Sequence, residues 1–232
     1  MDRRSFGRVC LLAAAAAFRA DAPVRAQPLA STFLARYNRV LLVTGTGEPV
    51  RAGALEPEED YLFFYPFAST PCFLLDLGRS LAPTEVPVRS SNAGYAWTGG
   101  VGPRRSVAAF TAICPHEWAH PDRTFSPIHY HRAGEKATLV YGRDRLIVCC
   151  AHGSAFDPAA GGRLEQGPAE VPLALITLEW DPGRDELFAS ALLGPDSFGR
   201  FFQGFRGKSR APVEGQTAVI RLREYSALVA RC

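Results

Sequence analysis

Two short segments of this chain combine cysteine with histidine at spacings that suit metal binding. Cys114–His116 reads Cys-x-His, and Cys149–His152 reads Cys-x-x-His. Each segment offers one thiolate and one imidazole, so together they supply four ligands. Such a set can hold a tetrahedral zinc ion, or a [2Fe–2S] cluster with both cysteines on one iron and both histidines on the other.

Both segments come directly after predicted strands. The apolar run Ser106–Ile113 leads into the first segment, and Leu146–Val148 leads into the second. Short apolar runs between turn residues are typical of buried strands. Because both cysteine–histidine pairs would project from strand ends, we expect them to converge on one site.

The rest of the chain also predicts β-structure. Short runs rich in Val, Leu and Phe recur between Gly, Pro and acidic turns, which favours an all-β, antiparallel sandwich or barrel. The predicted strands outside the two segments above are Arg39–Thr44, Tyr61–Tyr65, Cys72–Leu77, Val86–Arg89, Ala137–Tyr141, Leu173–Trp180, Glu186–Ala191 and Thr217–Leu222. Two helices are expected, a short one at Pro28–Tyr37 and one at Ser197–Phe205, where four phenylalanines follow helical spacing.

Residues 1–26 have the composition of an export signal. Arg3 and Arg4 precede Val9–Phe18, an apolar run of ten residues that is too short to span a membrane. The arginine pair resembles the twin-arginine export signal, and Val24–Ala26 offers a cleavage site. We expect a periplasmic protein, associated with the membrane only through a retained signal segment or a partner subunit.

Composition and charge narrow the class of protein further. With 47% hydrophobic residues the chain can build a core, and residues 27–232 are expected to form one domain. These residues carry 21 basic and 21 acidic side chains, so their net charge is zero. A neutral domain gives no reason to expect a nucleic acid as partner.

The two segments resemble the ligand boxes of Rieske [2Fe–2S] proteins, most specifically at the His-Gly-Ser sequence that begins at His152. The resemblance implies a Rieske-like antiparallel β base domain with an inserted, small cluster-binding subdomain at about 111–170. It also implies that Cys114 and Cys149 bind one iron, and that His116 and His152 bind the other. Ser154 matches a serine whose hydroxyl bonds a cluster sulfide. Gly167–Ala169 matches part of a loop that covers the cluster.

The sequence departs from the Rieske pattern in three ways. Ala119 and Ala151 stand where many such proteins carry a disulfide beside the cluster. Phe156 stands where a tyrosine often donates to a ligand sulfur, so we expect a lower reduction potential than in a typical bc-complex subunit. The spacing of 34 residues between Cys114 and Cys149 is longer than usual.

The long spacing contains three further histidines. His120 is expected to pack in a loop beside the site, and His129 and His131 are expected to share one face of a strand as solvated or partner-facing side chains. Cys150 is expected to point away from the metals, and a Cys72–Cys232 disulfide is allowed in an oxidising compartment. The acidic run Glu56–Asp60 is expected to be a solvated loop.

These observations predict an electron-transfer subunit rather than an independent enzyme. It would pass single electrons from a quinol or a redox enzyme to a cytochrome or similar acceptor, within a bc-type complex or as an oxidoreductase subunit. Two alternatives remain open. A Rieske-type oxygenase component would need a second iron site of two histidines and a carboxylate. A structural zinc-binding module would use the same four ligands without redox chemistry.

Overall fold

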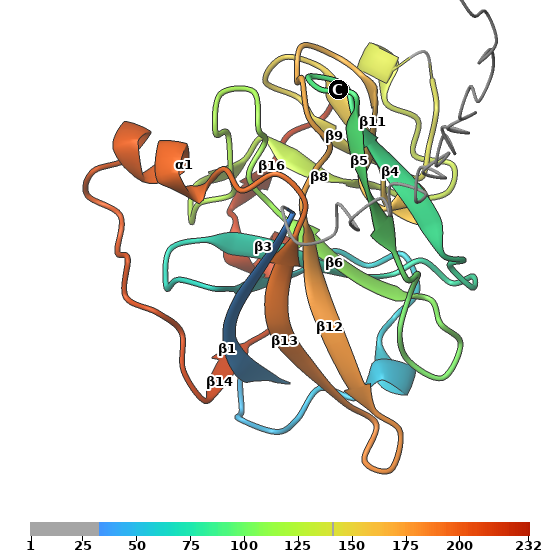
Figure 1. Ribbon diagram of the computed structural model, residues 1–232, viewed down its shortest axis with the longest axis vertical. Helices are drawn as coiled ribbons and strands as arrows, with labels where there is room; N and C mark the ends of the chain where they lie inside the picture. Colours follow the sequence, from blue (N-terminus) through green and yellow to red (C-terminus); the bar gives the residue numbers. More distant parts are fainter. Residues whose placement is uncertain (1–32, 141) are drawn as a thin grey trace, which may run out of the picture.

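The computed structural model describes residues 33–140 and 142–232. Strands are the main secondary structure of these residues and helices are few, which confirms the all-β prediction (Figure 1). The predicted signal segment, 1–26, lies outside the described residues. Among the described residues, no helix is long and apolar enough to cross a membrane.

A large, mostly antiparallel sheet of eight strands forms the base of the molecule. Its order is β14-β1-β13-β12-β6-β3-β2-β15, and only the β1–β14 pair is parallel. The strands are β1 (Leu34–Val43), β2 (Tyr61–Phe64), β3 (Pro71–Asp76), β6 (Val107–Thr111), β12 (Leu175–Asp181), β13 (Glu186–Leu193), β14 (Gln216–Ala218) and β15 (Ile220–Arg221).

The middle of this sheet is buried on both faces. All six residues of β3 and all five residues of β6 are buried, because separate apolar clusters pack on the two sides. Phe73 and Phe110 face one cluster, whereas Cys72 and Ala109 face the other. This double burial explains why both strands read as unbroken apolar runs.

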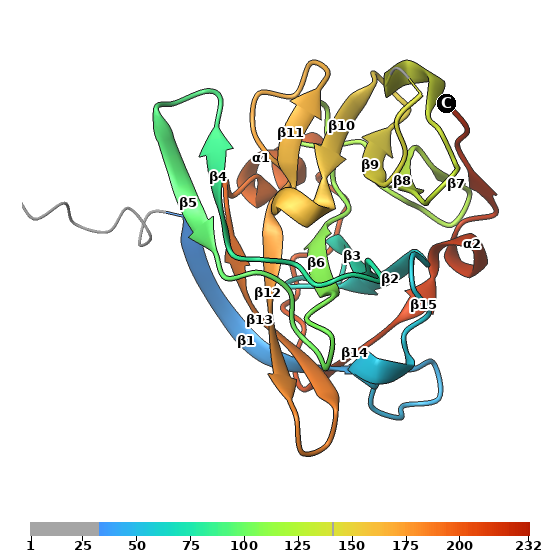
Figure 2. The ribbon, with the colours of Figure 1, turned by 90° about the vertical axis from the view of Figure 1, so that its right-hand side faces the viewer.

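A second sheet lies in the chain segment between β6 and β12. It has the order β11-β10-β9-β8, and all three of its strand pairs are antiparallel (Figure 2). Its strands are β8 (Ile128–His131), β9 (Leu146–Cys149), β10 (Ser154–Asp157) and β11 (Arg163–Gln166). Two small ribbons complete the β-structure, one formed by β4 (Thr84–Val88) with β5 (Ala93–Trp97), the other by β7 (Phe125–Ser126) with β16 (Leu228–Val229).

The helical predictions were correct at one end of the chain and wrong at the other. Helix α1 (Phe198–Gly204) forms where Ser197–Phe205 was predicted, and it buries Phe198, Phe201 and Phe202. Residues 34–37 of the predicted helix Pro28–Tyr37 instead belong to β1, because they pair with β13. A second short helix, α2 (Leu222–Tyr225), comes directly before β16.

Within residues 33–140 and 142–232, three short 3-10 helices lie in the connections. They are η2 (Ala52–Ala54), η3 (Thr138–Val140) and η4 (Pro158–Ala160). The strand predicted at Ala137–Tyr141 was wrong, since η3 occupies its middle. Ala137 makes one isolated bridge to Arg143.

Candidate metal centre

The first cysteine–histidine segment is a tight loop that follows β6. The Cys114 amide donates to the Ala119 carbonyl at 2.8 Å, and the Trp118 amide donates to the Cys114 carbonyl at 2.9 Å. Trp118 takes a φ of 60°, which lets the chain turn back within this loop. The His116 amide donates to the Cys114 sulfur. The loop therefore fixes Cys114 by its own backbone hydrogen bonds.

The second segment is the turn between β9 and β10. The Gly153 amide donates to the Cys149 carbonyl at 2.9 Å, and Gly153 has a φ of 75°, which favours glycine. The amides of Ala151 and His152 donate to the Cys149 sulfur. Both candidate ligand sulfurs thus accept backbone N–H groups, an arrangement that stabilises negative charge on sulfur.

The fold brings the two segments together in the way that the sequence predicted. Cys114 and Cys149 are 2% and 1% exposed, and their thiol groups form a hydrogen bond. The rings of His116 and His152 meet edge to face, with centroids 4.9 Å apart. The sulfur pair is buried and the imidazole pair lies nearer the surface.

A hydrogen bond joins the two thiols and shifts their pKa values in opposite directions. The hydrogen bond from Cys114 to Cys149 raises the pKa of Cys114, and burial raises it further. The same bond lowers the pKa of Cys149 to about 7, with help from the two backbone amides. The hydrogen bond therefore favours the thiolate form of Cys149, and the thiolate is the metal-binding form.

The two histidines differ in their surroundings. The Nδ1 atom of His116 is buried without a hydrogen-bond partner, so it is free to bind a metal. The His152 side chain is 47% exposed, and its Nε2 atom lies 3.7 Å from the Glu117 carboxylate. Sequence reasoning missed Glu117, which is 63% exposed and adjoins His116 in the loop. Its position becomes visible only once the two loops meet.

Ser154 and the segment Gly167–Ala169 close the site from one side. The buried Ser154 hydroxyl accepts the Ala169 amide at 3.2 Å and donates to the Cys114 sulfur. The resemblance had assigned this hydroxyl to a cluster sulfide, whereas here it bonds a ligand sulfur. A Cβ atom added at Gly167 would lie 2.4 Å from the Ser154 Cα atom, so the segment packs directly on the second loop.

The four candidate ligands form two pairs rather than one group of four. Among the described residues, two groups of metal-ligand side chains have atoms within 4.8 Å of one another. They are His116–Glu117–His152 and His129–His131–Cys150. The sulfurs of Cys114 and Cys149 belong to neither group. Separate sulfur and imidazole pairs fit a two-iron cluster better than a single zinc ion, whose four ligands must surround one point.

The other histidines do not join this site. His120 packs edge-on against Phe201 of α1 and against Phe205, which directly follows this helix, and its Nδ1 atom lies 2.7 Å from the Trp118 carbonyl. The prediction that His120 packs in a loop is confirmed. His129 and His131 share one face of β8 as predicted, but they are buried rather than solvated.

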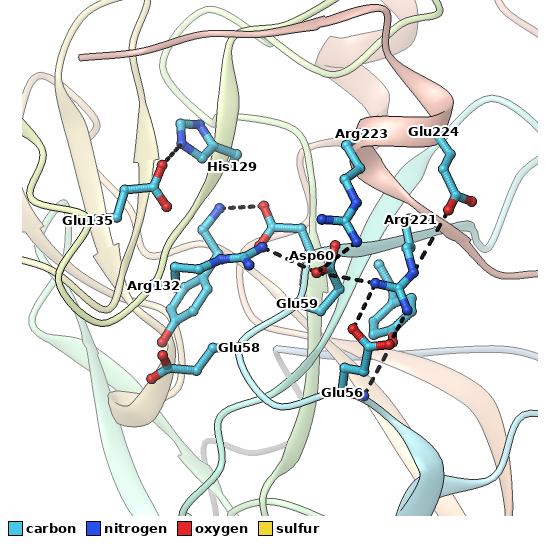
Figure 3. A network of polar contacts seen from close by, with 12 residues as sticks. Glu56, Glu58, Glu59, Asp60, His129, Arg132, Glu135, Arg221, Arg223 and Glu224 are labelled. Carbon is cyan, nitrogen blue, oxygen red and sulfur yellow. Dashed lines mark hydrogen bonds and ion pairs between the residues drawn. The ribbon is translucent and has the colours of Figure 1, made fainter.

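One disulfide that the sequence only allowed does not form, and one expectation was wrong. Cys232 forms its disulfide with Cys150, not with Cys72, which is a free and buried thiol. The run Glu56–Asp60 is not a fully solvated loop, because Glu59 and Asp60 are buried beneath arginine side chains and β8 (Figure 3). In both cases the partners lie far away in the sequence.

No protein-family model matches the sequence. Among solved structures, the chain is similar to the crystal structure of the soluble domain of the Rieske protein II (soxF) from Sulfolobus acidocaldarius. The two share 24% sequence identity over 67% of this chain and 78% of that chain, with a TM-score of 0.48. The assignment of the site therefore rests on the geometry of its own residues.

Proposed function

We propose that this protein transfers single electrons and that it binds a Rieske-type [2Fe–2S] cluster for this purpose. The observation that carries the proposal is the separation of ligands into a buried sulfur pair, Cys114 and Cys149, and an outer imidazole pair, His116 and His152. Cys114 and Cys149 would hold the inner iron, and the two histidines would hold the outer one. When bound, such a cluster supplies reversible one-electron transfer.

The chain's own groups would tune this centre. Three backbone amides and the Ser154 hydroxyl donate to the two sulfurs, so they favour the more negative, reduced state. Phe156 is fully buried in the same apolar cluster as Cys114 and Cys149, and it offers no donor. These contacts support a potential below that of centres in which a tyrosine hydroxyl is also present.

The exposed side chain of His152 supports proton transfer at the candidate metal centre. Its imidazole reaches solvent, and the Glu117 carboxylate lies beside its Nε2 atom. With a quinol as donor, the deprotonated Nε2 atom of His152 would accept the proton that leaves with the electron. A ring that is also an iron ligand would then be a neutral imidazole, and the Glu117 carboxylate would accept a hydrogen bond from its Nε2–H group.

We propose further that the protein works in the periplasm beside a redox partner. The arginine pair and apolar run within residues 1–26 support export, and the exposed edge of the site at His152 supports docking by a cytochrome or an oxidoreductase subunit. Membrane association would come from a retained signal segment or from the partner.

EPR spectra of the wild-type protein and of two matched variants test the proposal. Dithionite-reduced protein should give a rhombic EPR signal with a low average g value, together with two irons and two sulfides per chain. His152→Ala should lose this signal, whereas His120→Ala should keep it, because His120 contacts α1 and lies outside the ligand pairs. Zinc in place of iron, or an intact signal in His152→Ala, would refute the assignment.

The oxygenase alternative receives less support. It requires two histidines and a carboxylate around one iron. The structure places the three additional histidines in two different surroundings, His120 against α1 and His129 with His131 beside a disulfide. We therefore propose electron transfer to a partner rather than substrate oxidation within this chain.

A further inference from the structure

A second set of two cysteines and two histidines gathers outside the candidate metal centre. His129 and His131 come from β8, Cys150 follows β9, and Cys232 is the last residue of the chain. Cys150 and Cys232 form a disulfide, and the His131 Nε2 atom lies 3.9 Å from the Cys232 sulfur. The ligand atoms of His129, His131 and Cys150 all lie within 4.8 Å of one another.

The side chains of His129 and His131 are buried, and each has a ring nitrogen without a hydrogen-bond partner. They are 5% and 2% exposed, and their rings stack with centroids 4.1 Å apart. The Nδ1 atom of each is buried without a hydrogen-bond partner. Burial, with His131 nearby, lowers the pKa of His129 to about 3, so the imidazole is neutral. Neutral imidazole with a free ring nitrogen is the form that binds metals.

Backbone hydrogen bonds hold the two cysteines near these histidines without help from the disulfide. The Cys150 amide donates to the Pro127 carbonyl at 2.7 Å. The C-terminal strand β16 pairs with β7, and the Ala230 amide donates to the Ser126 carbonyl at 2.9 Å. The Cys232 carbonyl accepts the Thr138 amide at 2.5 Å. Opening the disulfide would therefore leave both thiols in place.

We propose that reduction of the Cys150–Cys232 disulfide creates a Cys2His2 site for a zinc ion, with His129 and His131 as its other ligands. A dithiol reductant supplies the two electrons and two protons. The sulfur–sulfur bond breaks, two thiols form, and the reductant becomes a disulfide. Zinc then binds both thiolates and both imidazoles, and the two thiol protons are released.

The distances suit this exchange. In tetrahedral zinc sites, bonds of about 2.3 Å to sulfur and about 2.0 Å to nitrogen place neighbouring ligand atoms about 3.3–3.8 Å apart. The His131 Nε2 atom already lies 3.9 Å from the Cys232 sulfur, and the ligand atoms of both histidines lie within 4.8 Å of the Cys150 sulfur, so the histidines need only small movements. The sulfurs must separate, which the broken bond permits.

The residues around the proposed zinc site leave it open to an ion from solvent, and they include a carboxylate partner for His129. His129 and Cys150 line an open cleft of about 1050 Å³, together with Glu59, Arg132 and Glu135. Figure 3 shows Glu135 beside His129, with its Oε1 atom 3.9 Å from the Nε2 atom of the imidazole. A carboxylate in this position can orient a metal-binding histidine and increase its basicity.

The test counts metal on the cluster-containing protein. Oxidised protein and protein treated with a phosphine reductant are incubated with zinc, freed of unbound metal by gel filtration, and analysed for zinc and iron. The reduced protein should carry one more zinc per chain than the oxidised protein, with unchanged iron. Cys232→Ser and His131→Ala should lose this additional zinc, whereas Cys72→Ser and His120→Ala should retain it.

Two further measurements exclude the first centre and misfolding as explanations. Cobalt bound to reduced Cys114→Ser protein should still give the visible bands of a tetrahedral site with two sulfur ligands, since that variant loses only the first site. Cys232→Ser changes the terminal residue, and its unfolding temperature reports whether the fold persists. No additional zinc after complete reduction would overturn the proposal, as would additional zinc that Cys232→Ser retains.

Discussion

Replacing Asp60 with asparagine should stabilise the protein at neutral pH, although the aspartate makes a native hydrogen bond. Asp60 lies under β8, where its Oδ2 atom accepts the Tyr130 amide at 2.9 Å, while Oδ1 is buried without a partner. Burial raises its pKa from 3.8 to about 8, because the single amide and the Arg132 charge only partly offset the loss of solvent. Glu59 and Glu135 raise the pKa further.

The sign of the pH dependence follows from this shift. The unfolded chain releases the Asp60 proton near pH 3.8, but the folded protein keeps it until about pH 8. The folded state therefore binds more protons between these values, and stability falls as pH rises through them, by about 1.4 kcal/mol per pH unit. At pH 7 the cost is about 4 kcal/mol, the same order as the cost of a buried, unpaired charge.

His129 changes the pH dependence of stability in the opposite direction to Asp60. Its folded pKa is lowered to about 3, so its contribution to stability decreases as pH falls below its ordinary value of 6.5. This contribution is common to wild-type protein and Asp60→Asn, and it cancels in the difference between them. Asparagine keeps an acceptor for the Tyr130 amide and cannot ionise.

Denaturant unfolding at two pH values measures the effect. The stability of Asp60→Asn minus that of wild type should grow by about 3 kcal/mol between about pH 5 and about pH 7.5. Asp122→Asn is the matched control of opposite sign, because amides of Phe125 and Thr124 lower the pKa of Asp122. Asp122→Asn should have a lower free energy of unfolding than the wild type at neutral pH, and this difference should disappear at acidic pH. An Asp60→Asn difference that does not change with pH would show that the carboxyl is not desolvated as its burial implies.

Three further variants test the candidate metal centre. Ser154→Ala removes a hydrogen-bond donor to the Cys114 sulfur. If this bond is about 1–2 kcal/mol stronger in the reduced state, the reduction potential of the variant should be lower than that of the wild type by about 40–90 mV. A redox titration measures the difference. Phe156→Tyr should raise the potential, and an unchanged value would mean that the hydroxyl cannot reach a ligand sulfur. Gly167→Ala forces a side chain against Ser154 at a φ of 100°, and should cost about 1–3 kcal/mol or more of unfolding free energy. Gly207→Ala, where a Cβ atom meets nothing within 4 Å, should be close to neutral in the same unfolding measurement.

The two ligand loops could be predicted from local sequence. Cys114–His116 and Cys149–His152 each follow a strand whose apolar run is readable, and each turn is closed by hydrogen bonds within a few residues. Their meeting was predicted because both loops project from strand ends, although β6 belongs to the base sheet and β9 to the second sheet. The hydrogen bond between the two thiols could not be expected, because it depends on the contact between the loops.

The errors have a common physical origin in long-range contacts. Residues 34–37 extend as a strand because β13 supplies their hydrogen-bond partners, and no local signal in the sequence marks that pairing. Glu59 and Asp60 look like solvated acids in the sequence, but α2 and β8 cover them. Side chains of this kind are mostly exposed, so charge alone predicts the wrong surroundings.

What the sequence determined by itself is the set of chemical groups and their local geometry. Spacing placed a thiolate and an imidazole in each loop, and the period of a strand placed His129 and His131 on one face. Only the tertiary structure decided which distant groups they meet. Cys150 and Cys232 are 82 residues apart, and they pair because β16 runs beside β7. Burial, and with it the charge state of His129 and Asp60, depends on packing from several elements at once, which no single stretch of sequence encodes.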